Sequence, residues 1–340
     1  MQAYFDQRQD HHHPQTYFTQ GQMKQPQEIP DRTGRIQAGL RAAGLMLEAP
    51  RDHGTASLNQ VHDLGYLRFL ASAHRRWAAM GDSWGPEVLS NIFVRSPNPK
   101  RGILAEAGAY LADGSCPVGA GTWESAYWSA QTALTAAGDL LAGQSMAYAL
   151  CRPPGHHARV DAAGGFCYLN NAAIAAEALR ERYPRIAILD TDVHHGQGIQ
   201  EVFYERSDVL YISIHGDPTD FYPVVAGFED ERGSEAGYGT NINLPLPHGS
   251  NAEAFFGRLN EALEAIRLFG PDAIIFDNGF DIYRADPQAK IGVASEDFER
   301  LGAAVADLGL PTLVVQEGGY HLGSLETNIQ YLIQGLTTAS

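Results

Sequence analysis

Short apolar runs alternate with longer amphipathic stretches along most of the chain beyond residue 120. The apolar runs suit strands buried on both faces of a parallel sheet, and the stretches between them carry apolar residues at helical spacing. This alternation indicates an α/β fold in which helices flank a central, mostly parallel, multi-stranded sheet. The predicted strands cover residues 146–151, 186–189, 209–214, 273–276 and 312–315, and the predicted helices cover 123–142, 170–182, 252–269, 295–308 and 325–336.

The N-terminal part of the chain has a weaker pattern. Residues 1–35 are polar and contain three prolines, so we expect an irregular arm or loop there rather than a separate domain. Helical spacing predicts two packing helices over 35–47 and 65–80. Residues 83–121 are rich in Gly and Pro without a sustained period, and we expect them to form a long insertion loop with a functional role.

Size and composition favour one large domain over residues 1–340, since 44% of the residues are hydrophobic and support a sizeable core. Apolar runs stay well short of the roughly 18 residues that span a membrane. The N-terminus lacks the basic start and apolar stretch of a secretory signal. We therefore expect a soluble, cytoplasmic protein with no membrane partner.

The charge and the cysteines narrow the chemistry further. A formal net charge of −16 argues against nucleic acid as a partner and would attract a cationic substrate. The three cysteines have no CxxC spacing, which argues against a disulfide framework or a thiolate zinc cluster. A metal would therefore use oxygen and imidazole ligands. The run His11 to His13 is expected at a solvated or rim position.

One predicted strand runs directly into a group of polar residues. The segment 186–198 reads IAILDTDVHHGQG, in which Asp190, Asp192 and His194 follow the apolar run in strict alternation. Alternation places these side chains on one side of an extended backbone. Buried carboxylates beside imidazoles are costly unless a cation or a proton network satisfies them. The segment therefore predicts a metal or catalytic site.

Polar residues also follow the other predicted strands, and ligands gather at the carboxyl ends of the strands in open α/β sheets. The five loops read CRPPGHH (151–157), DTDVHHGQG (190–198), SIHGD (213–217), FDNGFDIYRADP (276–287) and QEGGY (316–320). A catalytic zinc keeps three protein ligands and one open position. Asp192 and His194 would supply two, and spacing leaves Asp277, Asp281 and Asp286 as choices for the third. Two carboxylates and one imidazole also suit Fe(II) or Co(II).

Two of these loops offer groups for proton transfer and for binding an oxyanion. His156 and His157 follow a rigid Pro-Pro-Gly turn and suit general acid and base work, with Asp190 as a partner that orients one of them. Tyr320 follows two glycines, which give its phenol room to donate to a developing oxyanion. With a metal to polarise the carbonyl, these groups compose amide hydrolysis without a covalent intermediate.

Aromatic side chains could wall a substrate pocket beside these groups. Phe166 in GGFCYLNN and Tyr222 are the predicted walls, while Phe221 is expected in the core. Cys167 has no adjacent base in the sequence, so we expect a packed or pocket-lining thiol rather than a nucleophile. Asp281 is interpreted as a carboxylate that stabilises its own turn.

The motifs resemble the histone deacetylase superfamily, which has the arginase-deacetylase α/β fold, and within it the bacterial acetylpolyamine branch. CRPPGHHA, GGFCYLNN, DTDVHHGQG, GFDIYRADP and EGGY stand in family order and spacing, and VHDLGYLRFL and GTWE are similar to that branch. The resemblance implies a zinc-dependent deacetylase of small cationic acetylated amines, such as acetylputrescine or acetylcadaverine.

Residue roles follow from the same resemblance. The implied Zn(II) ligands are Asp192, His194 and Asp286, which favours Asp286 over the other two aspartates of its loop. The implied catalytic residues are His156 and His157 as a tandem acid and base pair and Tyr320 as the oxyanion donor. The implied supporting residues are Asp190 as the partner of His156, and Ser213 with backbone carbonyls near residues 190–194 at a structural K⁺ site. The implied substrate-binding residues are Gly165, Phe166, Cys167, Tyr222 and Glu106.

The insertion 83–121 is similar to the loop that, in the acetylpolyamine branch, builds a homodimer and narrows the active-site tunnel. Glu106 lies within it, either as a partner for a distal ammonium or as a solvated surface glutamate. Two positions depart from the family pattern. Gln197 stands where many members have Asp or Asn, so its contact with His157 is not assured. Asp277 adds a charge where relatives have small or apolar residues.

Three other readings remain open at this point. A binuclear arginase-like enzyme would need carboxylates where this chain has Gly196 and Arg284, so one metal is favoured. A non-catalytic protein that binds acetylated ligands is expected to have lost a ligand or the tyrosine, and all are present. A protein acetyl-lysine deacetylase is the closest competitor, because its substrate shares the acetamidobutyl end of an acetylated polyamine.

Overall fold

The structure, a computed structural model, describes residues 1–94 and 99–338. Its centre is an eight-stranded sheet in the order β4-β1-β5-β12-β10-β6-β7-β8, with parallel pairing throughout. The strands are β1 (Gln2–Tyr4), β4 (Leu47–Glu48), β5 (Met146–Ala149), β6 (Ile186–Asp190), β7 (Val209–Gly216), β8 (Asn241–Leu246), β10 (Ala273–Asn278) and β12 (Thr312–Gln316). The predicted single α/β domain with a central parallel sheet is confirmed.

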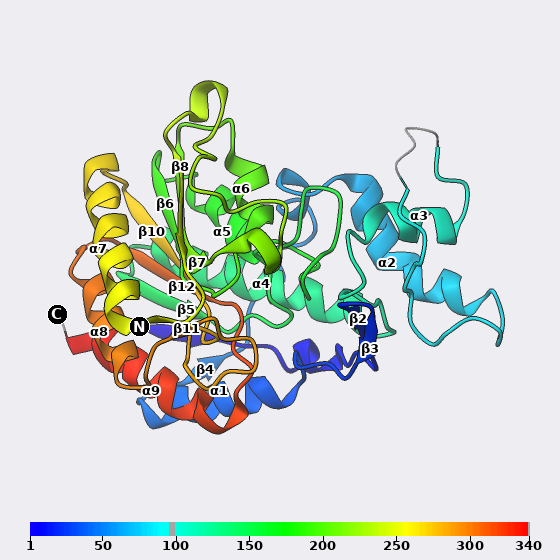
Figure 1. Ribbon diagram of the computed structural model, residues 1–340, viewed down its shortest axis with the longest axis horizontal. Coiled ribbons are helices and arrows are strands. Elements are labelled where there is room, and N and C mark those ends of the chain that lie inside the picture. The colour runs from blue at the N-terminus through cyan, green and yellow to red at the C-terminus, as the bar shows by residue number, and fades with distance from the viewer. Residues whose placement is uncertain (95–98, 339–340) are drawn as a thin grey trace.

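Helices cover both faces of this sheet (Figure 1). Their bounds are α1 (Asp31–Ala42), α2 (Leu64–Ala78), α3 (Ile103–Tyr110), α4 (Thr122–Leu141), α5 (Asn171–Leu179), α6 (Gln197–Phe203), α7 (Ala252–Phe269), α8 (Asp297–Ala306) and α9 (Leu322–Thr338). Helices α1, α7, α8 and α9 contribute to one core, and α2, α4 and α5 contribute to the other. Along β6, Ile186 and Ile188 enter the second core while Ala187 and Leu189 enter the first. Burial on both faces explains the continuous apolar run of this strand.

Local side chains set several helix ends close to their predicted positions. The predicted helix over 252–269 coincides with α7, where the Asn251 side chain accepts a hydrogen bond from the backbone N–H of Ala254. Gly270 ends the same helix in the left-handed conformation, which glycine adopts without a steric cost. Asn170 caps α5 in the same manner, by accepting from the N–H of Ala173.

The prediction of an irregular arm over residues 1–35 is wrong in three places. Strand β1 lies inside the sheet between β4 and β5. Strands β2 (Tyr17–Thr19) and β3 (Gln22–Lys24) form an antiparallel hairpin, and α1 begins at Asp31. Strands of three residues are too short for a periodic pattern, so only their pairing partners define them. In the run His11 to His13, predicted at a solvated or rim position, His11 and His13 are exposed, but His12 is buried at 2% exposure with its Nδ1 3.0 Å from the Oγ1 of Thr122.

The insertion 83–121 is partly helical, since it contains α3. Its described residues, 83–94 and 99–121, lie with α2 in a lobe beside the main sheet, at the right of Figure 1. Residues 95–98 of the insertion lie outside the described part of the chain. Two further short strands, β9 (Ser250–Asn251) and β11 (Ile291–Gly292), pair with each other outside the main sheet.

None of the helices within residues 1–94 and 99–338 is both long and apolar enough to cross a membrane.

Candidate metal centre and active site

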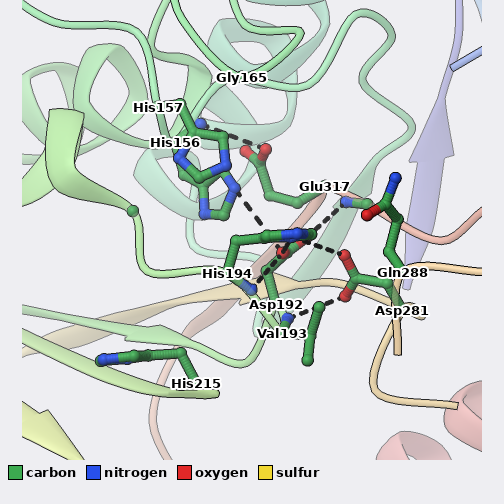
Figure 2. Close-up of polar contacts among 12 residues, drawn as sticks. His156, His157, Gly165, Asp192, Val193, His194, His215, Asp281, Gln288 and Glu317 are labelled. Atoms are coloured by element: carbon green, nitrogen blue, oxygen red, sulfur yellow. Dashed lines mark hydrogen bonds and ion pairs between the residues drawn. The ribbon is translucent and has the colours of Figure 1, made fainter. Parts of the chain in front are cut away.

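The loops after β6 and β10 bring two carboxylates and one imidazole together. Potential ligand atoms of Asp192, His194 and Asp281 all lie within 4.8 Å of one another, and the three side chains are buried. The Nδ1 of His194 is 3.1 Å from the Oδ1 of Asp192 and 3.3 Å from the Oδ2 of Asp281 (Figure 2). The sequence also predicts two carboxylates and one imidazole at this place, but it assigns the second carboxylate to Asp286 and not to Asp281.

Asp286, the third ligand implied by the resemblance, is not among the three residues whose ligand atoms come together. Its Oδ2 accepts hydrogen bonds from the backbone N–H groups of Tyr320 at 2.6 Å and His321 at 2.8 Å, and its Oδ1 accepts from the N–H of Gln288 at 2.9 Å. The carboxylate of Asp286 thus fastens the Tyr320 loop. Asp281, interpreted from the sequence as a turn residue, is the aspartate that faces His194.

The chemistry of this cluster fits a divalent cation. One oxygen of Asp281 accepts from the N–H of Val193 at 2.9 Å, while the other accepts no hydrogen bond although it is buried. Burial and the nearby charge of Asp192 raise the pKa of Asp281 to about 8. A cation would satisfy this oxygen and remove the repulsion between the carboxylates. Three candidate ligands, one of which (His194) lines a pocket, match the form of a catalytic metal site.

Two adjacent histidines stand over this cluster, with ring centroids 3.9 Å apart (Figure 2). The Nδ1 of His156 is 3.0 Å from the Oδ2 of Asp190, and the Nδ1 of His157 is 2.6 Å from the Oε1 of Gln197. The glutamine that departs from the family pattern therefore reaches His157. The Nδ1 of His156 therefore faces a carboxylate, whereas the Nδ1 of His157 faces a neutral amide.

These partners separate the pKa values of the two histidines. Burial lowers the pKa of His156, but the charges of Asp190, Asp192 and Glu317 outweigh it and raise that pKa to about 10. Burial, together with the charges of His156 and His194, holds the pKa of His157 well below its usual value. His157 is therefore a neutral imidazole near pH 7, and His156 is an imidazolium.

Tyr320 is held at the pocket by the backbone of the loop that follows β12. The Nε of Arg32 donates to the carbonyl of Gly319 at 2.6 Å, and its Nη2 donates to the carbonyl of Glu317 at 2.7 Å. The Oε2 of Glu317 accepts from the N–H groups of Gly155 at 2.7 Å and His156 at 3.2 Å, which ties this loop to the histidine turn. Burial raises the pKa of the Tyr320 phenol well above its usual value, so the phenol remains a hydrogen-bond donor.

One pocket reaches these groups from the surface. It is lined by Tyr17, Thr19, Gln20, Lys24, Ser115, His157, Gly165, Phe166, His194, Tyr222, Gln288 and Tyr320. The predicted wall residues Gly165, Phe166 and Tyr222 are therefore placed at the pocket. Phe221, expected in the core, is 8% exposed and stacks on the His194 ring at a centroid distance of 4.5 Å.

Two residues predicted to bind substrate lie elsewhere. Both carboxylate oxygens of Glu106 accept from the guanidinium of Arg76, at 2.6 and 2.7 Å, beside a separate surface hollow. Its carboxylate is engaged because α2 and α3 pack together in the lobe. Cys167 is fully buried behind the pocket wall, where its thiol donates to the carbonyl of Gly165. Neither side chain lines the pocket of His157 and Tyr320.

The remaining predicted residues surround the strand ends. Asp190 and Ser213 are paired in register on β6 and β7, and the Oγ of Ser213 is 2.8 Å from the Nδ1 of His215. Asp277 is paired in register with Asp190, and neither of its buried oxygens accepts a hydrogen bond within the described structure. Burial and the charge of Glu317 raise the pKa of Asp277 well above its usual value.

Comparisons with known proteins identify the family to which this fold and site belong. The chain belongs to the histone deacetylase family, because the model of the histone deacetylase domain matches residues 26–336. It is 59% identical over 335 residues to the acetylpolyamine amidohydrolase of Burkholderia pseudomallei, with 98% of each chain covered. It is 38% identical over 320 residues to the acetylpolyamine amidohydrolase of Mycoplana ramosa, covering 93% of this chain and 94% of that one.

Solved structures show the same relationship. The crystal structure of an acetylpolyamine aminohydrolase from Burkholderia pseudomallei matches this fold with a TM-score of 0.99 at 59% identity, covering 100% of this chain and 99% of that one. The HD domain of HDA15 matches with a TM-score of 0.81 at 29% identity, covering 99% and 91%. The resemblance inferred from the motifs is confirmed.

Several residues at the site received no role, or a different one, from the sequence. Asp281 was interpreted as a carboxylate that stabilises its own turn, and Glu317 lies inside the quoted EGGY motif but was given no role. Arg32, Asp113 and Lys24 lie outside the motifs, and only the folded chain brings them to the pocket loops.

Proposed function

We propose that this protein is a metal-dependent amidohydrolase that removes acetyl groups from acetylated polyamines such as acetylputrescine and acetylcadaverine. The observation that carries the proposal is the convergence of the Asp192, His194 and Asp281 cluster with His157 and Tyr320 at one pocket. The names of relatives that match nearly the whole chain support the substrate class.

The proposed roles follow from the geometry of the pocket. Asp192, His194 and Asp281 would hold Zn(II), although Fe(II) and Co(II) suit the same donors. When bound there, the ion supplies a Lewis acid for the acetyl carbonyl and makes water more acidic. His157, a neutral imidazole with its Nδ1 directed to Gln197, accepts the proton of the attacking water.

The other two groups handle charge and the leaving amine. Tyr320 donates a hydrogen bond from its phenol to the oxygen of the acetyl carbonyl as negative charge develops there. The imidazolium of His156, fixed by Asp190, adds positive charge beside the cluster, with its Nε2 3.8 Å from the Oδ1 of Asp192. The leaving amine then takes a proton from the His157 imidazolium formed in the first step, which returns both histidines to their starting states.

The proposed function includes three further assignments. Asp190 and Ser213, paired in register, would supply oxygens to a structural K⁺ ion. The protein would act as a homodimer through the insertion 83–121, which exposes Ile92 and Phe93 at 45% and 56%. A cytoplasmic location accords with three cysteines that are buried and free.

The decisive test is acetate release by the metal-loaded protein from a panel of amides. We expect turnover of acetylputrescine, acetylcadaverine and acetylspermidine to exceed that of acetyl-lysine peptides. Faster turnover of the peptides would instead support the protein deacetylase. Binding of acetylated amines without any acetate release would support the non-catalytic protein, and two tightly bound ions per chain would support the arginase-like alternative.

Lys24 places a positive charge among the residues that line the same pocket. Its Nζ donates to the Oε1 of Gln20 at 3.0 Å, and among the described lining residues there is no carboxylate. Replacing Lys24 with Glu should therefore raise kcat/KM for dicationic acetylspermidine about two- to fivefold at low salt, since exposed charges interact weakly and are screened.

The measurement compares acetylspermidine with neutral N-acetylbutylamine at low and high ionic strength. Lys100→Glu makes the same charge change at a different hollow and should have little effect. Equal gains from both variants would show that net charge, and not the position of Lys24, controls the preference.

A further inference from the structure

A chain of hydrogen bonds runs outward from the His157 imidazole to the insertion 83–121. The Nδ1 of His157 is 2.6 Å from the Oε1 of Gln197, and the Nε2 of Gln197 donates to the phenol oxygen of Tyr222 at 3.2 Å. The phenol of Tyr222 donates to the Oδ2 of Asp113 at 2.7 Å. Three side chains therefore separate His157 from solvent along this path, and the last is a carboxylate.

The carboxylate of Asp113 fixes which group donates and which accepts in each of these hydrogen bonds. An ionised Asp113 can only accept, so the Tyr222 phenol must donate to it and its oxygen is left to accept from Gln197. Gln197 must then turn its NH₂ group toward Tyr222 and its carbonyl oxygen toward His157. Because that oxygen can only accept, the Nδ1 of His157 must carry the proton, which leaves its Nε2 free to take a proton at the pocket.

Flipping the Gln197 amide would reverse this result. The NH₂ group would face His157, the Nδ1 would have to accept, and the neutral imidazole would carry its proton on Nε2. The Tyr222 phenol would then donate to Gln197, and Asp113 would no longer accept a hydrogen bond from that phenol. Burial, and after it the charge of Asp113, keeps the pKa of Tyr222 well above its usual value, so the phenol retains the proton it donates.

The path is also well packed. The ring of Tyr222 stands edge-on to the His157 ring at a centroid distance of 4.7 Å, and a methyl group at Gly164 would come within 2.9 Å of the Tyr222 phenol oxygen. Asp113 is fixed in turn, because its Oδ1 accepts from the N–H and hydroxyl of Ser115, and its Oδ2 also accepts from the N–H of Gly165 at 3.1 Å.

We infer that Asp113 is a positioning residue that selects the Nδ1–H tautomer of His157 through Tyr222 and Gln197. This inference rests on the proposed function for its catalytic consequence, but the tautomer itself does not. The insertion thereby controls whether His157 presents a lone pair or an N–H to the substrate.

The direct test is the tautomer of His157 in ¹⁵N-histidine-labelled, Zn(II)-loaded protein, with the resonance assigned by its loss in His157→Ala. We expect a protonated Nδ1 and an unprotonated Nε2 in the unchanged protein. Asp113→Asn keeps the shape but adds a donor, and Tyr222→Phe keeps the ring but removes the phenol. Each should convert His157 to a mixture of tautomers. An unchanged tautomer in both variants overturns the inference.

Kinetics supply the second readout. Asp113→Asn should lower kcat about three- to tenfold, the range of a single hydrogen bond, with a smaller change in KM. The double variant with Tyr222→Phe should be no slower than Tyr222→Phe alone, since both act on one path. Additive losses, or a change confined to KM, would assign Asp113 to holding the Gly165 turn instead.

A matched control is present on another surface. Asp52 also accepts from a tyrosine phenol, that of Tyr127, and from a glycine N–H, that of Gly54. Asp52→Asn should leave the His157 tautomer and kcat unchanged. The tautomer is read without substrate, so absence of activity toward every amide would refute the proposed function while leaving this measurement valid.

Discussion

Replacing Tyr320 with Phe should leave the metal in place and lower kcat by about two to three orders of magnitude, the effect of removing one oxyanion donor. The phenol lines the pocket, and burial keeps it protonated. The ring would remain where it is, because the guanidinium of Arg32 lies 4.8 Å from its centroid and the Tyr320 N–H donates to Asp286. The measurements are metal content per chain and kcat on acetylputrescine.

Tyr283→Phe is the matched control, because Tyr283 is on the β10 loop and does not line the pocket. It should leave kcat within about twofold, as expected for a change away from the chemistry. Full activity of Tyr320→Phe would remove the phenol from the mechanism. Loss of metal from that variant would mean that it disturbs the cluster and does not test the phenol.

Replacing Asp281 with Ala should abolish both metal retention and turnover. Asp281 supplies one of three candidate ligands, and its Oδ2 lies 3.3 Å from the Nδ1 of His194. Loss of a Lewis acid worth several kcal/mol corresponds to a fall in kcat of about a thousandfold or more. Metal content after dialysis and kcat at saturating acetylputrescine are the measurements.

The variant Asp286→Asn tests whether Asp281 or Asp286 is needed to retain the metal. Asp286 binds backbone N–H groups of the Tyr320 loop, so this variant should keep one ion per chain while turnover falls as Tyr320 loses its position. The opposite pattern, with metal lost in Asp286→Asn and retained in Asp281→Ala, would restore the ligand set predicted from the sequence and refute the one proposed from the structure.

The parallel sheet and the loops of the site could be predicted because their signals are local. The apolar run of β6 ends in Asp190, and the alternation that follows places Asp192 and His194 on one side. Parallel strands then bring the five loops to a common edge, whatever the details of each loop.

The aspartate that faces His194 could not be predicted from the sequence because it depends on the path of one loop. Asp281 and Asp286 follow the same strand, and the chain turns between them, so spacing does not show which carboxylate faces His194. The same limit applies to Glu106, whose carboxylate is bound by Arg76 across α2 and α3. Strand β1 was missed for a related reason, since its three residues are defined only by pairing with β4 and β5.

The order of strands in the sheet has a consequence for how the protein folds. Strands β5 and β12 are neighbours, although β6, β7, β8 and β10 lie between them in the chain. During synthesis the group β10-β6-β7-β8 can assemble first, while β5 with β1 and β4 must wait for β12 to join the two halves. Until then β5 and β10 each expose an unpaired edge, and such edges favour association between chains. Slower synthesis of the chain should therefore prolong the time before β12 pairs with β5 and β10. Aggregation through the two unpaired edges should compete with folding during this time.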